Sequence, residues 1–167
     1  MRLYFLRLAA GGLTARRRTT MKRAPVILIV DDDEGHAILV RENLVAAGLD
    51  NTIHHFSDGQ AVLDFFFNPG SLHKHRDGQV YLILLDIRMP KVEGTEVLRR
   101  LKADPKLRKM PVVVLTTTDD AREVERCHEL GCNIYIQKPV DYDKFAEAIR
   151  RLGLFISLMM VPSTNGQ

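Results

Sequence analysis

Apolar and polar residues alternate along the chain in short segments whose lengths fit the strands and helices of a mixed fold. Five segments are rich in apolar residues and predict strands: 26–30, 52–56, 80–85, 112–115 and 133–136. Three of them, at 26–30, 80–85 and 112–115, are continuous aliphatic or aromatic runs. Such runs are typical of strands that are buried on both faces of a parallel sheet.

The segments between and after these strands repeat apolar residues every three or four positions, which predicts amphipathic helices. The predicted helices cover residues 38–48, 58–68, 95–102, 119–130 and 141–156. Asp58 and Asp141 are expected to cap helix N-termini, and Gly48 and Gly131 are expected to end helices. The apolar helix positions that we expect to face the core are Ile38, Leu39, Leu44 and Val45 in the first helix and Tyr142, Phe145, Ile149, Leu152 and Ile156 in the last.

Strands that alternate with helices predict an α/β fold in which helices cover both faces of a parallel sheet. We expect a flavodoxin-like, doubly wound sheet of five strands in the order 2-1-3-4-5, with five helices and three α/β/α layers. In this strand order, functional groups gather beyond the carboxyl ends of the first and third strands. Asp31 and Asp32 follow the first strand, and Asp86 follows the third.

Charge is distributed unevenly along the chain. The net charge is +3, but seven basic residues and no acidic residue precede residue 24. Residues 24–167 therefore carry 17 basic against 21 acidic residues, a net charge of −4. A mildly acidic fold without a basic stripe argues against a nucleic-acid partner.

Residues 1–23 are interpreted as a basic and poorly ordered extension before the fold. Their apolar stretch is too short to span a bilayer. The first Met is better explained as an upstream start codon, with translation really beginning at Met21, than as the start of a targeting leader. The two cysteines, Cys127 and Cys132, make neither a disulfide framework nor a zinc set. We therefore expect a cytoplasmic protein with reduced thiols and no membrane contact.

Three carboxylates are predicted to meet at one edge of the sheet, where they would repel one another unless a cation neutralised them. Asp31, Asp32 and Asp86 therefore predict a site for a hard divalent ion, and Mg²⁺ suits such oxygen ligands. The backbone carbonyl of Arg88 is a further candidate ligand.

Polar residues also follow the fourth and fifth predicted strands. Thr116 and Lys138 stand there, and a hydroxyl and an ammonium group can both bind a phosphoryl group. Singly, Thr116 is explained as a turn residue, Lys138 as a surface cation, and Asp33 as a helix cap. Four strand ends that carry Asp-Asp, Asp, Thr and Lys-Pro in chain order are not explained in this way. They predict phosphate chemistry at this edge of the sheet.

The sequence resembles the receiver domain of response regulators. The resemblance rests on ILIVDDDE, LILLDIRMP, VVVLTTT and YIQKP, which occur in family order with family-like spacing. It implies that Asp86 is the phospho-acceptor and that Asp31 and Asp32 hold Mg²⁺. It also implies that Thr116 and Lys138 bind the transferred phosphoryl group.

The resemblance covers residues 24–152 and implies three further features. Tyr135 would be the aromatic switch residue, and the peptide bond between Lys138 and Pro139 would be cis. A receiver is not an enzyme that acts on a separate substrate. It catalyses only its own phosphorylation and dephosphorylation.

Further stretches resemble the single-domain receivers that partner phytochrome histidine kinases. They are LLDIRMPKVEG, ADPKLRKMPVVVLTTT, NIYIQKPVDYDKFAEAI and the polar loop at 69–79. The resemblance implies that the phosphoryl donor is a sensor histidine kinase of the phytochrome type. Only fifteen residues follow Leu152, so we expect the signal to pass through protein contacts.

Residues 153–167 are predicted to be an apolar extension of the last helix, followed by a tail. Ser157 is the only polar residue between positions 154 and 161. A surface of this kind is typical of an interface, and the phytochrome-type resemblance implies a dimer that uses this end. We predict a homodimer built on the helix at 119–130, the strand at 133–136 and the last helix.

Two alternatives remain open. A haloacid-dehalogenase-like phosphatase would use Asp31 as its nucleophile, with Asp33 completing the motif, and would leave Asp86 without a role. A pseudo-receiver would be an interaction module that accepts no phosphate. Locating the phosphorylated aspartate distinguishes the first, and binding of beryllofluoride in the presence of Mg²⁺ distinguishes the second.

Overall fold

The structure, a computed structural model, describes residues 24–70, 75–76 and 78–160. The basic extension at 1–23, part of the 69–79 loop and the tail after residue 160 lie outside the described residues, as do the side chains of 158–160. The predictions for these segments therefore stay predictions.

Strands and helices alternate along the described residues in the predicted order. The strands are β1 (Val26–Val30), β2 (Ile53–Phe56), β3 (Tyr81–Leu85), β4 (Val112–Thr116) and β5 (Ile134–Gln137). The helices are α1 (Glu34–Ala46), α2 (Gly59–Phe67), α3 (Gly94–Ala103), α4 (Ala121–Glu129) and α5 (Tyr142–Met160). Helix α1 begins earlier than predicted because Asp33 caps it, accepting a hydrogen bond from the backbone N–H of His36 at 3.0 Å.

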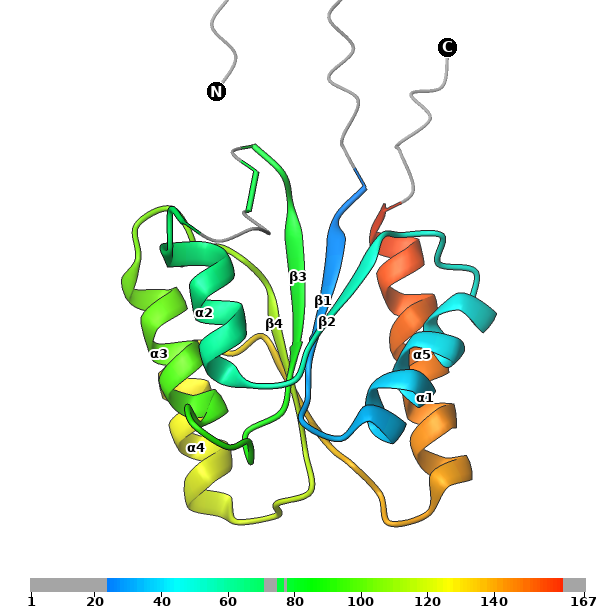
Figure 1. Cartoon of the computed structure of the whole chain (residues 1–167). Helices are drawn as coiled ribbons and strands as arrows, with labels where there is room; N and C mark the ends of the chain where they lie inside the picture. Colours follow the sequence, from blue (N-terminus) through cyan, green and yellow to red (C-terminus); the bar gives the residue numbers. More distant parts are fainter. Residues whose placement is uncertain (1–23, 71–74, 77, 161–167) are drawn as a thin grey trace, which may run out of the picture.

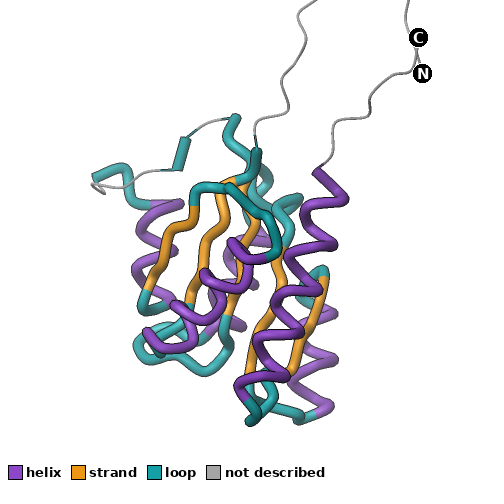
Figure 2. Tube along the Cα trace, turned by 90° about the vertical axis from the view of Figure 1, so that its right-hand side faces the viewer, coloured by secondary structure: helices purple, strands orange, loops and turns teal. Residues whose placement is uncertain are grey.

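The five strands form one parallel sheet in the order β2-β1-β3-β4-β5, as predicted. Helices α1 and α5 cover one face, and α2, α3 and α4 cover the other (Figure 1). Figure 2, seen from the side of α1 and α5, shows the strands between the two helical layers. The flavodoxin-like, three-layer fold is therefore confirmed, and its central strands β1 and β3 are paired on both sides.

Strand β1 contributes side chains to two separate cores. Leu28 and Val30 pack in the core under α2, α3 and α4, whereas Ile27 and Ile29 pack in the core under α1 and α5. Because both faces of the strand are covered, every position from 27 to 30 needs an apolar side chain. This explains why the run at 26–30 shows no alternation with polar residues.

The expectation that Ile38, Val45 and Tyr142 face the core is wrong. Helix α1 turns Val40 and Leu44 toward the sheet, which leaves Ile38 and Val45 about half exposed on the opposite side. Tyr142 is the first residue of α5 and is 61% exposed. The later apolar positions on the predicted face of α5 are buried.

Helix α5 continues past residue 152 to Met160, and two of its apolar side chains near this end face solvent. Leu154 and Phe155 are 54% and 51% exposed. Among the described residues, no helix combines the length and the apolar character needed to cross a membrane.

Candidate functional site

The carboxylates of Asp31 and Asp86 lie at the same edge of the sheet. Each residue directly follows a strand, and the last residues of these strands, Val30 and Leu85, are partners in the pairing of β1 with β3. The backbone N–H of Asp86 also donates to the carbonyl of Val30 at 2.9 Å. Asp31 is 3% exposed and Asp86 is 6% exposed. The register of the two central strands therefore brings two buried carboxylates together.

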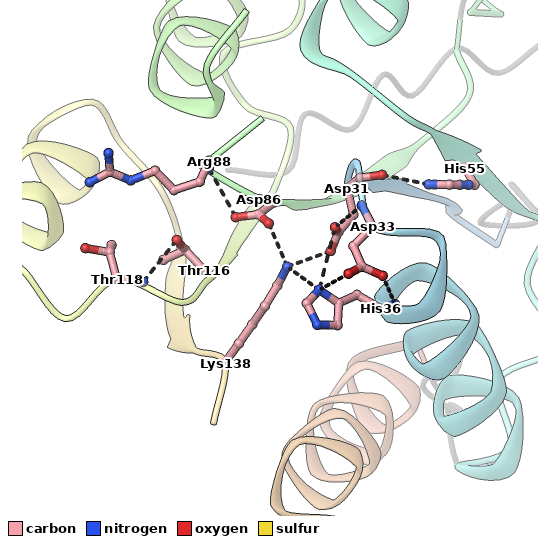
Figure 3. A network of polar contacts seen from close by, with 9 residues as sticks. All are labelled: Asp31, Asp33, His36, His55, Asp86, Arg88, Thr116, Thr118 and Lys138. Carbon is pink, nitrogen blue, oxygen red and sulfur yellow. Dashed lines mark hydrogen bonds and ion pairs between the residues drawn. The ribbon is translucent and has the colours of Figure 1, made fainter. Parts of the chain in front are cut away.

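Lys138 joins these two carboxylates (Figure 3). Its Nζ lies 2.6 Å from Oδ2 of Asp31 and 2.7 Å from Oδ2 of Asp86. The backbone N–H of Lys138 donates to the carbonyl of Thr116 at 2.7 Å, which holds the segment after β5 beside the end of β4. One buried ammonium between two buried carboxylates leaves the group with excess negative charge.

The surroundings of Asp31 disfavour its charged form. Burial raises the pKa of Asp31 above its ordinary value, and the ion pair with Lys138 offsets only part of this effect. The backbone N–H of Asp33, 3.0 Å from Oδ1 of Asp31, acts in the same direction as Lys138. A second cation next to Asp31 would therefore stabilise the carboxylate.

Asp32 completes the acidic group. Asp31, Asp32 and Asp86 can each offer one carboxylate oxygen, and these oxygens lie within 4.8 Å of one another. Asp32 is exposed, whereas the other two are buried. A set of oxygen donors with excess negative charge fits a hard divalent cation such as Mg²⁺. The contribution of the Arg88 carbonyl stays a prediction.

Thr116 and Tyr135 contact the same segment, the one between β4 and α4. Thr116 is fully buried, and its Oγ1 accepts a hydrogen bond from the backbone N–H of Thr118 at 3.4 Å. The hydroxyl of Tyr135 donates to the carbonyl of Thr118 at 3.2 Å. Burial and, to a smaller extent, the charge of Glu123 raise the pKa of Tyr135 to about 12. The two side chains are thus coupled through one segment, and their switching role stays a prediction.

His36 belongs to the site, although the sequence analysis did not identify it. Its Nδ1 lies 3.5 Å from Nζ of Lys138 and 3.9 Å from Oδ1 of Asp31. Its ring packs edge-on against Phe145, with ring centroids 6.0 Å apart. The available signal was its place in the first turn of a helix that directly follows the acidic run, since this turn must lie at the same sheet edge.

A pocket of about 450 Å³ adjoins His36 and Lys138. It lies between α1 and the segment that joins β5 to α5, and Pro139, Val140 and Tyr142 contribute to its walls. Val140 and Tyr142 are exposed at its rim. An apolar-walled hollow therefore stands directly beside the charged site.

The peptide bond between Lys138 and Pro139 is trans, like the other peptide bonds of the described residues. The expectation of a cis bond at this position is therefore wrong. The ion pairs of Lys138 form with the trans bond in place.

Residues 27–150 match the response regulator receiver domain family. A crystal structure of a response regulator receiver domain from Rhodospirillum rubrum is 46% identical in sequence and superimposes with a TM-score of 0.76. The match covers 84% of this chain and 99% of that chain.

Two further similar proteins are response regulators from cyanobacteria. The Mn²⁺-bound form of Rcp1 is 30% identical with a TM-score of 0.72, and the match covers 86% of this chain and 99% of that chain. In a sequence comparison, Rcp1 of Synechocystis sp. is 37% identical over 60% of this chain and 67% of its own length. The phosphorylated cyanobacterial phytochrome response regulator RcpA is 27% identical with a TM-score of 0.74, covering 81% of this chain and 95% of that chain.

Proposed function

The chain belongs to the response regulator receiver family, and on this premise we propose that it accepts a phosphoryl group on Asp86 from a phosphohistidine of a sensor histidine kinase. The observation that carries the proposal is the arrangement of Asp86, Asp31 and Lys138. A buried carboxylate at the end of β3 shares one ammonium group with a second buried carboxylate. Receiver-family proteins are signalling domains rather than conventional enzymes, so the phosphorylated state itself is the output.

The transfer needs little covalent chemistry from the protein. One carboxylate oxygen of Asp86 forms a bond to phosphorus while the bond between phosphorus and the donor imidazole nitrogen breaks, and that nitrogen keeps the electron pair. Lys138 lies 2.7 Å from the Asp86 carboxylate, where its charge can stabilise the incoming phosphoryl oxygens. The chain therefore contributes mainly position and charge.

Asp31, Asp32 and Asp86 would hold a divalent ion in this proposal. When bound, Mg²⁺ would neutralise negative charge on the transferring group. The support for this assignment is the cluster of three carboxylate oxygens, together with the Mn²⁺-bound form of the relative Rcp1. The backbone carbonyl of Arg88 is proposed as a further ligand.

Phosphorylation would be read out through Thr116 and Tyr135. New phosphoryl oxygens at Asp86 would draw the buried hydroxyl of Thr116 toward them. Because both side chains contact Thr118, a shift of Thr116 would alter the hydrogen bond of Tyr135. The surface formed by α4, β5 and α5 would then differ between the two states.

We expect the donor to be a kinase of the phytochrome type in the cytoplasm. The similarity to Rcp1 and to the phytochrome response regulator RcpA supports this donor class. The pocket beside His36 and Lys138, with exposed Val140 and Tyr142 at its rim, offers apolar surface next to Asp86 for such a partner.

A homodimer through α4, β5 and α5 is part of the proposal. Strand β5 lies at an edge of the sheet, and Phe155 on α5 leaves an apolar ring half exposed. Leu154, its neighbour, is exposed to a similar extent. Pairing of this face with a second copy would cover apolar surface that one copy leaves in water.

The proposal is tested by asking which aspartate takes up phosphate. The chain is incubated with Mg²⁺ and ³²P-labelled phosphoramidate, a small phosphohistidine mimic, and the incorporated label is counted. Asp86→Asn should incorporate none above background. Asp33→Asn is the matched control: it alters an acid at the same sheet edge, but asparagine still caps α1, so it should incorporate label like the unmodified chain. Undiminished label in Asp86→Asn would overturn the proposal.

The same experiment addresses the phosphatase alternative. A phosphatase of the haloacid-dehalogenase type would carry the label on Asp31, which borohydride reduction and mass spectrometry would locate. Family membership disfavours this alternative, and Asp33, which it would require for catalysis, is occupied as the cap of α1. A chain that neither takes label nor binds beryllofluoride would be a pseudo-receiver.

A further inference from the structure

An ion pair links the segment after β3 to the first turn of α4. Nη2 of Arg88 lies 2.7 Å from Oε2 of Glu123. The backbone N–H of Arg88 also donates to Oδ1 of Asp86 at 3.2 Å. One residue therefore touches the proposed phospho-acceptor with its main chain and α4 with its side chain. Figure 3 shows this side chain pointing away from Asp86.

The two partners of this ion pair differ strongly in their exposure to solvent. The Glu123 side chain is 14% exposed, and its Oε1 is buried without a hydrogen-bond partner in the described part of the chain. The Arg88 side chain is 57% exposed. A nearly buried carboxylate depends on its cation, whereas an exposed guanidinium can exchange one anion for another.

In the unphosphorylated site, the Asp86 carboxylate attracts the Arg88 guanidinium only weakly, because Lys138 already pairs with that carboxylate. Phosphorylation would replace the single carboxylate charge of Asp86 with a charge of about −1.5 to −2 on the phosphoryl group, and it would place three acceptor oxygens two residues before Arg88. The planar guanidinium matches such oxygens with two parallel hydrogen bonds. Lys91, on the same segment, is engaged at 2.6 Å by the buried carboxylate of Asp58. Arg88 is thus the better placed of these two cations to respond.

On the basis of the proposed phosphorylation of Asp86, we propose that the ion pair between Arg88 and Glu123 is a latch on α4. Arg88 leaves Glu123 for the phosphoryl group, and Glu123, without its cation, releases the first turn of α4. The helix then responds to Asp86 by an exchange of charge partners, in addition to any movement of Thr116 and Tyr135.

The latch lies close to the segment that these two residues contact. Asp120, the N-cap of α4, follows two residues after Thr118. The backbone of Thr118 is hydrogen-bonded to the side chains of both Thr116 and Tyr135. Glu123 lies close enough to Tyr135 for its charge to act on the phenol. A displaced Glu123 would therefore change the surroundings of Tyr135 as well as the end of α4.

The test is a double-mutant cycle with beryllofluoride as the phosphoryl mimic, at saturating Mg²⁺. Glu123→Gln keeps the shape of the side chain but frees Arg88, so it should tighten beryllofluoride binding about two- to fivefold, the range for a partly exposed ion pair. In the Arg88→Ala background, the same Glu123→Gln change should leave the affinity unchanged. The affinity is measured by isothermal titration calorimetry on the full chain.

The cycle separates the latch from a general charge effect. Removing a negative charge near an anion site can tighten binding without any exchange of partners, and this gain would persist in the Arg88→Ala background. An equal gain in both backgrounds would overturn the latch, and so would no gain in either. Glu96→Gln is the matched control, because it breaks an ion pair with Arg99 and Arg100 on α3 and should leave the affinity unchanged.

A second measurement guards against variants that merely fold poorly. In the Glu123→Gln variant without beryllofluoride, the backbone amide NMR signals of residues 121–125 should lie closer to their positions in the beryllofluoride-bound parent chain. Unfolding in urea shows whether each variant remains folded. If the parent chain fails to bind beryllofluoride, the proposed function and the latch both fail. If it binds but the cycle shows no dependence on Arg88, the latch alone is wrong.

Discussion

In β1 and β3, the middle of each strand and the residue that follows it are buried to a similar depth but with opposite chemistry. Leu28 and Ile83 are fully buried aliphatic side chains within the sheet. Asp31 and Asp86 follow the same two strands, are 3% and 6% exposed, and share the buried ammonium of Lys138. Burial of the first pair stabilises the fold, whereas burial of the charged group opposes it unless every charge is compensated.

The difference teaches that depth of burial does not distinguish structural from functional residues in this protein. What distinguishes them is whether the buried group would be more stable in water than in the protein interior. The aliphatic side chains are more stable in the interior, whereas the carboxylates would be better solvated in water. A fold that keeps carboxylates at the ends of its central strands retains, in our proposal, a site that a cation and a phosphoryl group can complete.

The largest effect on stability is expected where the buried charges lose their cation. Lys138→Met leaves the carboxylates of Asp31 and Asp86 without the ammonium that pairs with them and should lower the free energy of unfolding by about 3–5 kcal/mol at neutral pH. Lys138 lowers the pKa of Asp31, so its removal raises that pKa further. The folded variant then binds more protons than the unfolded one, and its deficit relative to the parent chain should shrink as the pH falls toward the carboxyl range.

Urea unfolding at about pH 7.5 and about pH 5 measures this deficit directly. Lys138→Arg is the control, since it keeps a positive charge at the same position. A deficit of equal size at both pH values would mean that packing, rather than charge, makes Lys138 important to the fold.

In the middle of the strand, the expected cost is similar in size but independent of pH. Ile83→Ala removes a fully buried side chain and should lower the free energy of unfolding by about 2–5 kcal/mol through lost burial and the cavity left behind. The same urea titrations at both pH values test it. Ile38→Ala, on the exposed side of α1, should cost within about 0.5 kcal/mol. If the stability cost of Ile83→Ala depended strongly on pH, the contrast between buried aliphatic and buried charged residues would be wrong.

A smaller effect is expected for a charge pair that is only half buried. The hydrogen bond from Lys91 lowers the pKa of Asp58, whose carboxylate also caps α2. Because Lys91 is largely exposed, Lys91→Met should cost only about 0.5–1 kcal/mol at neutral pH. This contribution is present above the carboxyl pKa of the unfolded chain and is lost as the pH falls through the lowered pKa of folded Asp58.

Thermal unfolding of Lys91→Met and the parent chain between neutral pH and about pH 3 would follow the loss. The two curves should converge at the acidic end. Asp58→Asn, which keeps a capping side chain but no charge, should behave like Lys91→Met. A loss of stability in Lys91→Met that grows as the pH falls would contradict the lowered pKa of Asp58.

The smallest effect on stability is expected where apolar side chains already face water. Changing Leu154 and Phe155 together to serine should alter the free energy of unfolding of one copy by less than about 0.5 kcal/mol. If these side chains contribute to the proposed homodimer, light scattering should nevertheless show a shift toward monomer. A dimer that persists in this variant, and in a chain truncated after Gly153, would count against the α5 interface.

The sheet and the position of the acidic group could be predicted because each rests on a local pattern. A continuous aliphatic run such as 26–30 can only be satisfied by a strand covered on both faces, and the order of such strands fixes which ends meet. Asp31, Asp86 and Lys138 follow from that order, and the structure brings them into direct contact. The side chains that fill the two faces of the sheet were predictable for the same reason.

The features that were missed depend on rotation about a helix axis or on contacts between distant segments. Ile38 and Val45 share their apolar spacing with Leu44, but α1 is rotated so that Leu44 and Val40 face the sheet, and the spacing alone does not fix that rotation. His36 enters the site only because α1 starts beside Lys138. The ion pair from Arg88 to Glu123 joins two segments whose distance in space no local pattern encodes.

Strand β1 is paired on both sides, with β2 and β3, and this has a consequence for the synthesis of the protein. The chain between the ends of β1 and β3, from Val30 to Leu85, takes on the order of 3–11 s to make at 5–20 residues per second. During that interval the aliphatic run of β1 is translated but its second neighbour does not exist. Such a run without its partners resembles an aggregation-prone segment. The yield of native protein in a cell should therefore depend on protection of this run by chaperones as much as on the stability of the finished fold.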